Sequence, residues 1–284
     1  MKTVGKVALV AGCVLIVGVV ISGVAIAKLA KDGFKTANEN MVTVDFDFDE
    51  EFSNIDINAV TNDIIVRRSD DNKTHVQCID FEEVEHDAYI DGDTLYVTTE
   101  IERGTNNFNF FFNNPPKIYV YLPETEYADL MIEATTADVV VGPDFRFDNI
   151  TIDVTTGDVS MTTLDVEDTL EMNVMTGDIN LTDIDCVDVV YNGTTGDLDF
   201  STVVASGDIR IDVTTGDIDF EGDAANIYLE CTTGDINMVL FSDKDFDVDV
   251  VTGDVSLPRG GDGDELGECV VELTTGDIDI EIDD

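Results

Sequence analysis

The chain has 284 residues, of which 62 are acidic and 14 basic, so its formal net charge at pH 7 is −48. An acidic surface of this kind repels phosphate backbones, which excludes a nucleic-acid-binding protein. The composition is nevertheless 43% hydrophobic, well above the level of disordered chains, so most of the sequence should fold.

The first element in chain order is an apolar segment, residues 7–27, whose 21 residues carry no charge and are flanked by lysines. At about 1.5 Å per residue it matches a hydrocarbon core of roughly 30 Å. We expect residues 1–35 to be a single-pass anchor in the cell membrane, with the β-rich remainder outside the cytoplasm, as is usual for exported domains. Two alternatives stay open, because Ala25-Ile26-Ala27 fits a signal-peptide cleavage site and Val10-Ala11-Gly12-Cys13 resembles a lipoprotein signal.

Residues 36–130 alternate between apolar and polar side chains, as in Val42–Phe48 and Ile118–Leu122, but lack a strict repeat. This alternation predicts strands that bury one face. Asn62-Asp63 resembles a degraded copy of a turn that recurs later. We expect a divergent β-rich cap here, because the first coil of a stacked fold must be protected against edge pairing.

A segment unlike the rest, residues 103–116, contains Phe108, Phe110, Phe111 and Phe112. It is expected to be a long loop. Exposed apolar clusters commonly mark contact sites, so these phenylalanines are candidates for contact with a partner or a membrane. The alternative is that they fold back on the cap.

From residue 131 to residue 284 one four-residue motif, Thr-Thr-Gly-Asp or a close variant, recurs at steps of 20, 20, 19, 20, 18, 19 and 23 residues. Its eight copies end in Ala137-Asp138, Gly157-Asp158, Gly177-Asp178, Gly196-Asp197, Gly216-Asp217, Gly234-Asp235, Gly253-Asp254 and Gly276-Asp277. Repetition at this period is typical of a solenoid or an array. Apolar residues alternate on both sides of each copy, which predicts a strand before and after every turn.

These features predict an all-β fold, a single β-solenoid whose coils follow the motif's spacing, with the cap before it and one transmembrane helix at the N-terminus. Each copy should stack above the last, about 4.8 Å away, in a solenoid of either handedness. Gly accepts φ > 0 at the corner, and the Asp can bond the backbone of its own turn. Gly193 stands at a core position where other copies place Val, Leu or Cys, so a bulge or a large neighbour should fill the gap.

The repeats, together with Ile118-Tyr119-Val120-Tyr121-Leu122-Pro123, resemble the bacterial putative-adhesin family, whose β-solenoid domains are called toastrack-like. The resemblance covers residues 41–284. It implies an envelope protein, often membrane-tethered, without established catalytic residues. Some members resemble components of cell-envelope stress systems, which makes envelope sensing a further hypothesis.

Stacked turns would place their carboxylates in one row, where unit charges about 4.8 Å apart repel by roughly 0.9 kcal/mol even in water. Calcium, which prefers oxygen ligands, would relieve this repulsion. The candidate cation ligands are Asp158, Asp178, Asp197, Asp217, Asp235, Asp254 and Asp277. The alternative is that each Asp is used by its own turn and screened by solution ions; no other cofactor is indicated.

Residues suited to catalysis are few. His75 and His86 are expected to be solvated, and Cys78, Cys186, Cys231 and Cys269 to be small buried side chains, since no CxxC pair occurs. The sequence therefore favours a membrane-tethered extracytoplasmic scaffold or adhesin-like protein without catalysis, with an envelope protein or polymer as partner. The alternatives are a polysaccharide-active β-helix enzyme and a cation-binding surface protein.

Overall fold

The computed structural model describes residues 41–82, 84–101, 115–258 and 266–283. The expected anchor, residues 1–35, and the candidate contact residues Phe108, Phe110, Phe111 and Phe112 lie outside these ranges. All regular structure in the described residues is β-strand, and none of it is a helix of the length and hydropathy that a bilayer crossing requires. The predicted all-β fold is confirmed for this part of the chain.

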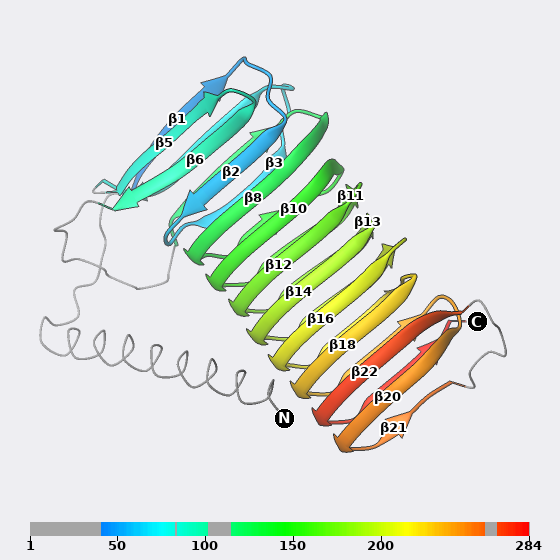
Figure 1. Ribbon diagram of the computed structural model, residues 1–284. Coiled ribbons are helices and arrows are strands. Elements are labelled where there is room, and N and C mark those ends of the chain that lie inside the picture. The colour runs from blue at the N-terminus through cyan, green and yellow to red at the C-terminus, as the bar shows by residue number, and fades with distance from the viewer. Residues whose placement is uncertain (1–40, 83, 102–114, 259–265, 284) are drawn as a thin grey trace, which may run out of the picture. The chain divides into compact units, whose positions relative to one another are not determined.

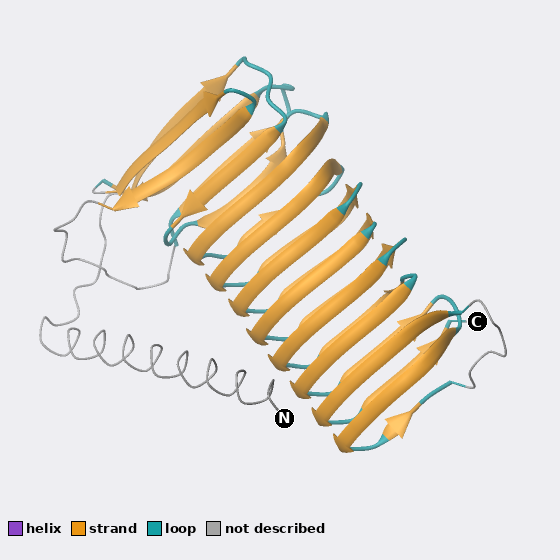
Figure 2. Cartoon of the chain, viewed as in Figure 1, coloured by secondary structure: helices purple, strands orange, loops and turns teal. Residues whose placement is uncertain are grey.

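The strands form the two flanks of a β-solenoid (Figure 1). The first flank contains, in spatial order, β1 (Met41–Phe48), β4 (Thr74–Phe81), β7 (Lys117–Leu122), β3 (Asp63–Arg68), β9 (Val139–Val141), β11 (Val159–Val166), β13 (Ile179–Cys186), β15 (Leu198–Ala205), β17 (Ile218–Asp223), β19 (Ile236–Leu240), β23 (Ile278–Ile282) and β21 (Val255–Ser256). The second flank contains β5 (Val84–Asp91), β6 (Thr94–Ile101), β2 (Asn54–Ala59), β8 (Glu126–Thr136), β10 (Phe145–Thr156), β12 (Thr169–Thr176), β14 (Asp188–Thr195), β16 (Asp208–Thr215), β18 (Asn226–Thr233), β22 (Gly267–Thr275) and β20 (Lys244–Thr252). Short turns join the flanks in the repeated coils from β8 to β19 (Figure 2).

Neighbouring coils pair in parallel, with equivalent residues side by side. In β16 and β18, for example, Ile211 pairs with Leu229 and Val213 with Cys231. The apolar positions face inward and form one core that runs through the stack, as the alternation predicts. Because every inward column continues from coil to coil, each coil supplies the hydrophobic surface that its neighbour needs.

The corner glycines are required by geometry. Gly216 has φ of +155°, and a Cβ placed on it would lie 1.9 Å from the carbonyl oxygen of Gly196 in the preceding coil. Other residues would therefore meet both an unfavourable backbone conformation and a backbone clash.

The gap at Gly193 is filled by a large neighbour, one of the two predicted outcomes. A Cβ on Gly193 would lie 2.1 Å from the hydroxyl oxygen of Tyr191, whose side chain is buried. Burial, together with the negative charge of Asp178, raises the pKa of the Tyr191 hydroxyl to about 12.

The coils at the C-terminal end do not stack in chain order. β22 pairs with both β18 and β20, so the last coil in the sequence lies between the two coils that precede it. The expectation that each copy stacks above the previous one is therefore wrong at this end. Pro258 offers a physical reason: it lies two residues beyond the short β21 and cannot donate a ladder hydrogen bond, so this coil is best placed at the edge of the stack.

The opposite end of the solenoid is built from antiparallel strands. β4 runs antiparallel to both β1 and β7, and β5 runs antiparallel to β6. β2 and β3 still pair in parallel with β8 and β9 of the repeat. The reversed strands β4 and β5 interrupt the parallel pairing that joins the repeated coils at this end of the stack.

Candidate functional site

The predicted cation ligands do form a continuous row, which we call the corner ladder. Its members in spatial order are Asp63, Asp138, Asp158, Asp178, Asp197, Asp217, Asp235, Asp277 and Asp254. In each case one carboxylate oxygen accepts a hydrogen bond from the backbone N–H of the next Asp. The N···O distance is 2.9 Å from Asp217 to Asp197 and 2.8 Å from Asp235 to Asp217.

This arrangement corrects the expectation that each Asp bonds its own turn. The carboxylate instead joins its coil to the next coil in space. The order follows the displaced C-terminal coil, because the backbone N–H of Asp277 donates to the Asp235 carboxylate and that of Asp254 donates to the Asp277 carboxylate. Each N–H brings a partial positive charge between successive carboxylates, which offsets part of their repulsion. The described residues contain no cluster of three or more His, Cys, Asp or Glu side chains with the geometry of a metal site.

A second column of carboxylates lies on the outer face of the second flank. Asp212, Glu230, Glu272 and Asp249 occupy equivalent positions in four successive coils. Partial burial and the charges of Asp212 and Glu272 raise the pKa of the Glu230 carboxyl. Burial and the two like charges therefore both disfavour the ionised form of Glu230.

Beside this column is a shallow hollow of about 350 Å³ that includes Arg210, Tyr228, Glu230 and Glu272. The Arg210 guanidinium lies 4.7 Å from the centre of the Tyr228 ring and also pairs with Asp208 at 2.7 Å. These contacts neutralise the one cationic group of the hollow, which leaves its acids as the charges available to a partner.

In the same column, coils nearer the N-terminal end carry amides in place of some acids. Asn192 donates to Asn173 at 3.0 Å, and Asn173 donates to Asp153 at 2.8 Å. Side-chain amides at these positions form a hydrogen-bonded ladder. The four-carboxylate segment therefore differs from its neighbours in having no such bonds among the described residues.

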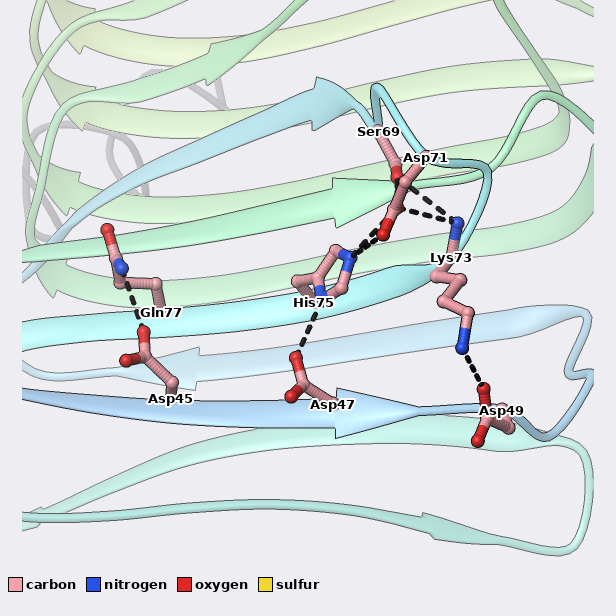
Figure 3. Close-up of polar contacts among 8 residues, drawn as sticks. All are labelled: Asp45, Asp47, Asp49, Ser69, Asp71, Lys73, His75 and Gln77. Atoms are coloured by element: carbon pink, nitrogen blue, oxygen red, sulfur yellow. Dashed lines mark hydrogen bonds and ion pairs between the residues drawn. The ribbon is translucent and has the colours of Figure 1, made fainter.

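His75 is the centre of a polar network on the outer face of β1 and β4 (Figure 3). Its Nδ1 lies 2.6 Å from an Asp47 oxygen, and its Nε2 lies 2.9 Å from Asp71. These hydrogen bonds, that to Asp47 first, raise the pKa of His75. The contact with His75, followed by that with Ser69, lowers the pKa of Asp71 to about 2.

The network therefore holds His75 in a charged state at mildly acidic pH, clamped between carboxylates from β1 and from the turn before β4. Lys73 adds a parallel link to Asp49 at 2.6 Å, and Gln77 donates to Asp45 at 2.8 Å. His75 lies at the surface, as expected. Both of its nitrogens are occupied, so it serves the cap and has no free nitrogen with which to act as a base.

His86 contradicts its prediction, because its side chain is only 1% exposed. Its Nε2 lies 3.1 Å from an Asp80 oxygen, within ion-pair distance but without the alignment of a hydrogen bond. Asn62 donates to the same Asp80 oxygen at 2.7 Å, and the backbone N–H of Phe81 donates to the other. These side chains form a buried polar cluster that joins β4 to β5.

Two sequence signals could have located this cluster. Asp80 shares its strand parity with Val76 and Cys78, both of which are buried, so a charged residue stands where an apolar one is expected. His86 likewise shares its parity with Ala88 and Ile90. The surrounding run of acids hid this pattern and suggested a solvated surface.

The four cysteines in the described residues are buried, as predicted. Burial raises the pKa of the Cys78, Cys186 and Cys269 thiols to about 12. Their thiolates are scarce at neutral pH, so these side chains are poor nucleophiles and metal ligands.

The described architecture is that of a parallel β-solenoid with Gly-Asp corners and an antiparallel cap. The chain belongs to the Toastrack DUF4097 family, whose model matches residues 52–282. No curated protein is similar to it.

Several solved structures are distantly similar. A putative adhesin from Bacteroides fragilis is 16% identical, with 87% of this chain and 100% of that chain covered and a TM-score of 0.49. A putative cell adhesion protein from Clostridium sporogenes is 14% identical, with coverage of 86% and 100% and a TM-score of 0.27. A putative lipid binding protein from Parabacteroides distasonis is 15% identical, with coverage of 84% and 97% and a TM-score of 0.25.

Proposed function

We propose that this protein is a non-catalytic binding scaffold, held at the membrane by residues 7–27, that presents its solenoid outside the cytoplasm to an envelope protein or polymer. The observation that carries this proposal is the four-carboxylate column of Asp212, Glu230, Glu272 and Asp249, which we call the acidic column. A rigid parallel stack fixes the spacing of these groups at about 4.8 Å per coil.

Such a column suits a partner with repeated cationic groups. Each exposed ion pair contributes little by itself, about 1 kcal/mol or less. Several pairs formed by one chain act together, because the first contact raises the effective concentration for the next. A cationic partner would also relieve the repulsion by Asp212 and Glu272 that, after burial, raises the pKa of Glu230.

The absence of catalysis is part of the proposal. It is supported by the occupied nitrogens of His75, by the burial of His86 and by the raised pKa values of the Cys78, Cys186 and Cys269 thiols. Membrane tethering is supported by the uncharged segment before the solenoid. Envelope sensing would follow if binding at the column changed the state of another envelope component.

The test uses the full-length chain in detergent with two probes, cell-wall sacculi and a chitosan oligomer, which carries a cationic group on each sugar. A variant with Asp212→Asn, Glu230→Gln and Glu272→Gln should lose most of its salt-sensitive binding. A control with Asp183→Asn, Asp185→Asn and Asp199→Asn removes equal charge from the first flank and should bind nearly as wild type does.

Equal losses in the two variants would show that only the net charge matters and would contradict a site at the acidic column. Shortened chitosan or sugar released from sacculi by the wild type would contradict the non-catalytic assignment. Recovery of the mature chain in the soluble fraction, beginning at Lys28, would replace tethering by a cleaved signal peptide.

A further inference from the structure

The end of the solenoid opposite the cap has an open strand edge. β20 (Lys244–Thr252) pairs with β22 on one side, and no strand of the described residues pairs with its other side. It is nine residues long, whereas β21 in the same coil has two. β20 therefore presents a row of backbone donors and acceptors long enough to pair with another extended segment.

The side chains of β20 alternate strictly along this edge. Asp245, Asp247 and Asp249 point outward and are exposed. Phe246 and Val248 point toward the core but are only partly buried, because no further coil of the described residues covers them. An added strand with small apolar side chains on one face would complete their burial.

Exposed apolar surface is concentrated in this terminal coil. Val251 is 75% exposed, Val255 is 41% exposed and Leu257 is 42% exposed. Elsewhere in the described residues, exposed large apolar side chains occur singly, such as Tyr89 in the cap. Exposed apolar side chains that gather in one coil are typical of a surface that another molecule covers.

The corner of the terminal coil also has hydrogen-bonding groups without a partner among the described residues. In an earlier coil the N–H of Gly216 donates to the Thr233 carbonyl, and Ile218 donates to the Asp235 carbonyl. Gly253 and Val255 are the equivalent donors of the terminal coil, and no later coil of the described residues receives them. Asp254 likewise ends the corner ladder, so its carboxylate has no following N–H to accept.

We propose that β20 is a docking strand for an extended segment of a partner protein in which basic and apolar residues alternate. The segment adds to the sheet by main-chain hydrogen bonds, its basic side chains face Asp247 and Asp249, and its apolar side chains cover Phe246 and Val248. The docking strand shares Asp249 with the acidic column, but its backbone edge and its apolar residues Phe246 and Val248 lie outside that column, so different variants test the two proposals.

A second copy of this chain fits the edge less well. On the second flank the outermost cap strand, β5, runs antiparallel to β6, so a second copy stacked end to end in the same direction would not place a parallel strand beside β20. Two copies of β20 paired antiparallel about Val248 would place Asp247 of one copy opposite Asp249 of the other. Like charges directly opposite destabilise a strand pair, whereas opposite charges stabilise it.

The experiment measures binding of a fluorescent alternating Lys-Val peptide to the full-length protein in detergent at physiological salt. A peptide of the same composition with its valines grouped is the control for charge alone. The alternating peptide should bind more tightly, and the backbone amides of β20 should become protected from hydrogen exchange when it binds.

Charge reversal locates the site. Asp247→Lys with Asp249→Lys should weaken binding of the Lys-Val peptide about tenfold and create binding of an alternating Glu-Val peptide. Asp185→Lys with Asp199→Lys makes the same charge change at exposed positions of the first flank and should do neither.

Three outcomes would overturn the proposal: equal affinity for the alternating and grouped peptides, equal losses in the two reversed variants, or unchanged exchange of the β20 amides. The exchange measurement uses the wild type, so it decides the question even if a variant fails to fold. A concentration-dependent dimer that protects β20 without peptide would assign the edge to a second copy instead.

Discussion

The repeated coils and the N-terminal cap are stabilised in different ways. In the coils the Gly-Asp corners repeat the same contacts: a Gly packs against the backbone of a neighbouring coil, and the Asp carboxylate, except at the terminal Asp254, accepts from the next coil in space. In the cap each contact occurs once, such as Asn62 with Asp80 or His75 with Asp47. The repeated coils are therefore held together by one set of contacts that recurs in each coil. The cap at the N-terminal end instead depends on individual contacts that the repeat does not contain.

The largest effect should come from adding one methyl group at a corner. Gly216→Ala should destabilise the protein by about 4 kcal/mol or more, because its Cβ would lie 1.9 Å from the Gly196 carbonyl oxygen. The matched control is Gly92→Ala in the β5–β6 hairpin, where φ is also positive but no atom lies within 4 Å. It should cost only the backbone strain, about 1 to 2 kcal/mol. Chemical unfolding measures both, and equal losses would show that stacking does not require the corner Gly.

The next largest loss of stability should come from a substitution in the buried polar cluster of the cap. Asp80→Ala leaves Asn62 and His86 buried without their partner, which should cost about 3 kcal/mol. Asp45→Ala is the control, because Asp45 also accepts an amide hydrogen bond at 2.8 Å but at an exposed position. Its cost should be under about 1 kcal/mol. A small loss for Asp80→Ala in thermal unfolding would indicate that the cluster does not hold β4 to β5.

The corner ladder should be sensitive to the loss of an acceptor and tolerant to the loss of charge. Asp217→Ala removes the acceptor for the Asp235 N–H and should cost about 1 kcal/mol. Asp217→Asn keeps an acceptor oxygen and removes one like charge, so its stability should match or exceed that of the wild type. Unfolding in sodium and calcium salts of equal ionic strength separates screening from binding. If calcium stabilised the wild type much more than sodium did, and Asp217→Asn lost this extra stabilisation, the result would support a cation site at the corner ladder.

The smallest effect should be a pH dependence at His75. Its folded pKa is raised, so its stabilisation is complete below the ordinary value of 6.5 and is lost as pH rises through the folded value. Asp71 behaves oppositely: its lowered pKa gives stabilisation above 3.8 that is lost as pH falls toward about 2. The wild type should therefore exceed His75→Ala in Tm most between these two ordinary values, by about 3 °C at most. A difference that grows above pH 8 would contradict this assignment.

The sequence was most informative where the chain repeats. Period-two alternation around each Gly-Asp pair predicted the strands, the inward columns and the continuous row of corner carboxylates, because each is a property of one coil copied along the chain. The hydrogen bond that the Asp217 carboxylate accepts from the Asp235 N–H of the following coil could not be predicted, since identical turns allow a bond either within the turn or between coils. The buried pair of His86 and Asp80 was missed because it depends on the packing of β5 against β4.

Chain order at the C-terminal end was also missed. Pro258 lies two residues beyond β21 and is compatible with an edge position, but only the pairing of β22 with both β18 and β20 shows which coil is outermost. The periodicity of the sequence cannot distinguish the stacking order of two coils that carry the same corner motif. The choice between them depends on which coil can satisfy hydrogen bonds on both sides.

Each Gly-Asp corner forms its hydrogen bonds with the corner that is adjacent in space, even where that corner is not the next one in the chain. The most direct measurement is thiol crosslinking at equivalent strand ends, mapped by mass spectrometry after mild oxidation. Thr233→Cys with Thr275→Cys should form a disulfide, because these positions are paired across adjacent strands about 4.8 Å apart. Thr233→Cys with Thr252→Cys should not, because one coil lies between them and their separation, about 9.6 Å, exceeds the reach of a disulfide. The reverse pattern would show that the coils stack in sequence order and would contradict the account.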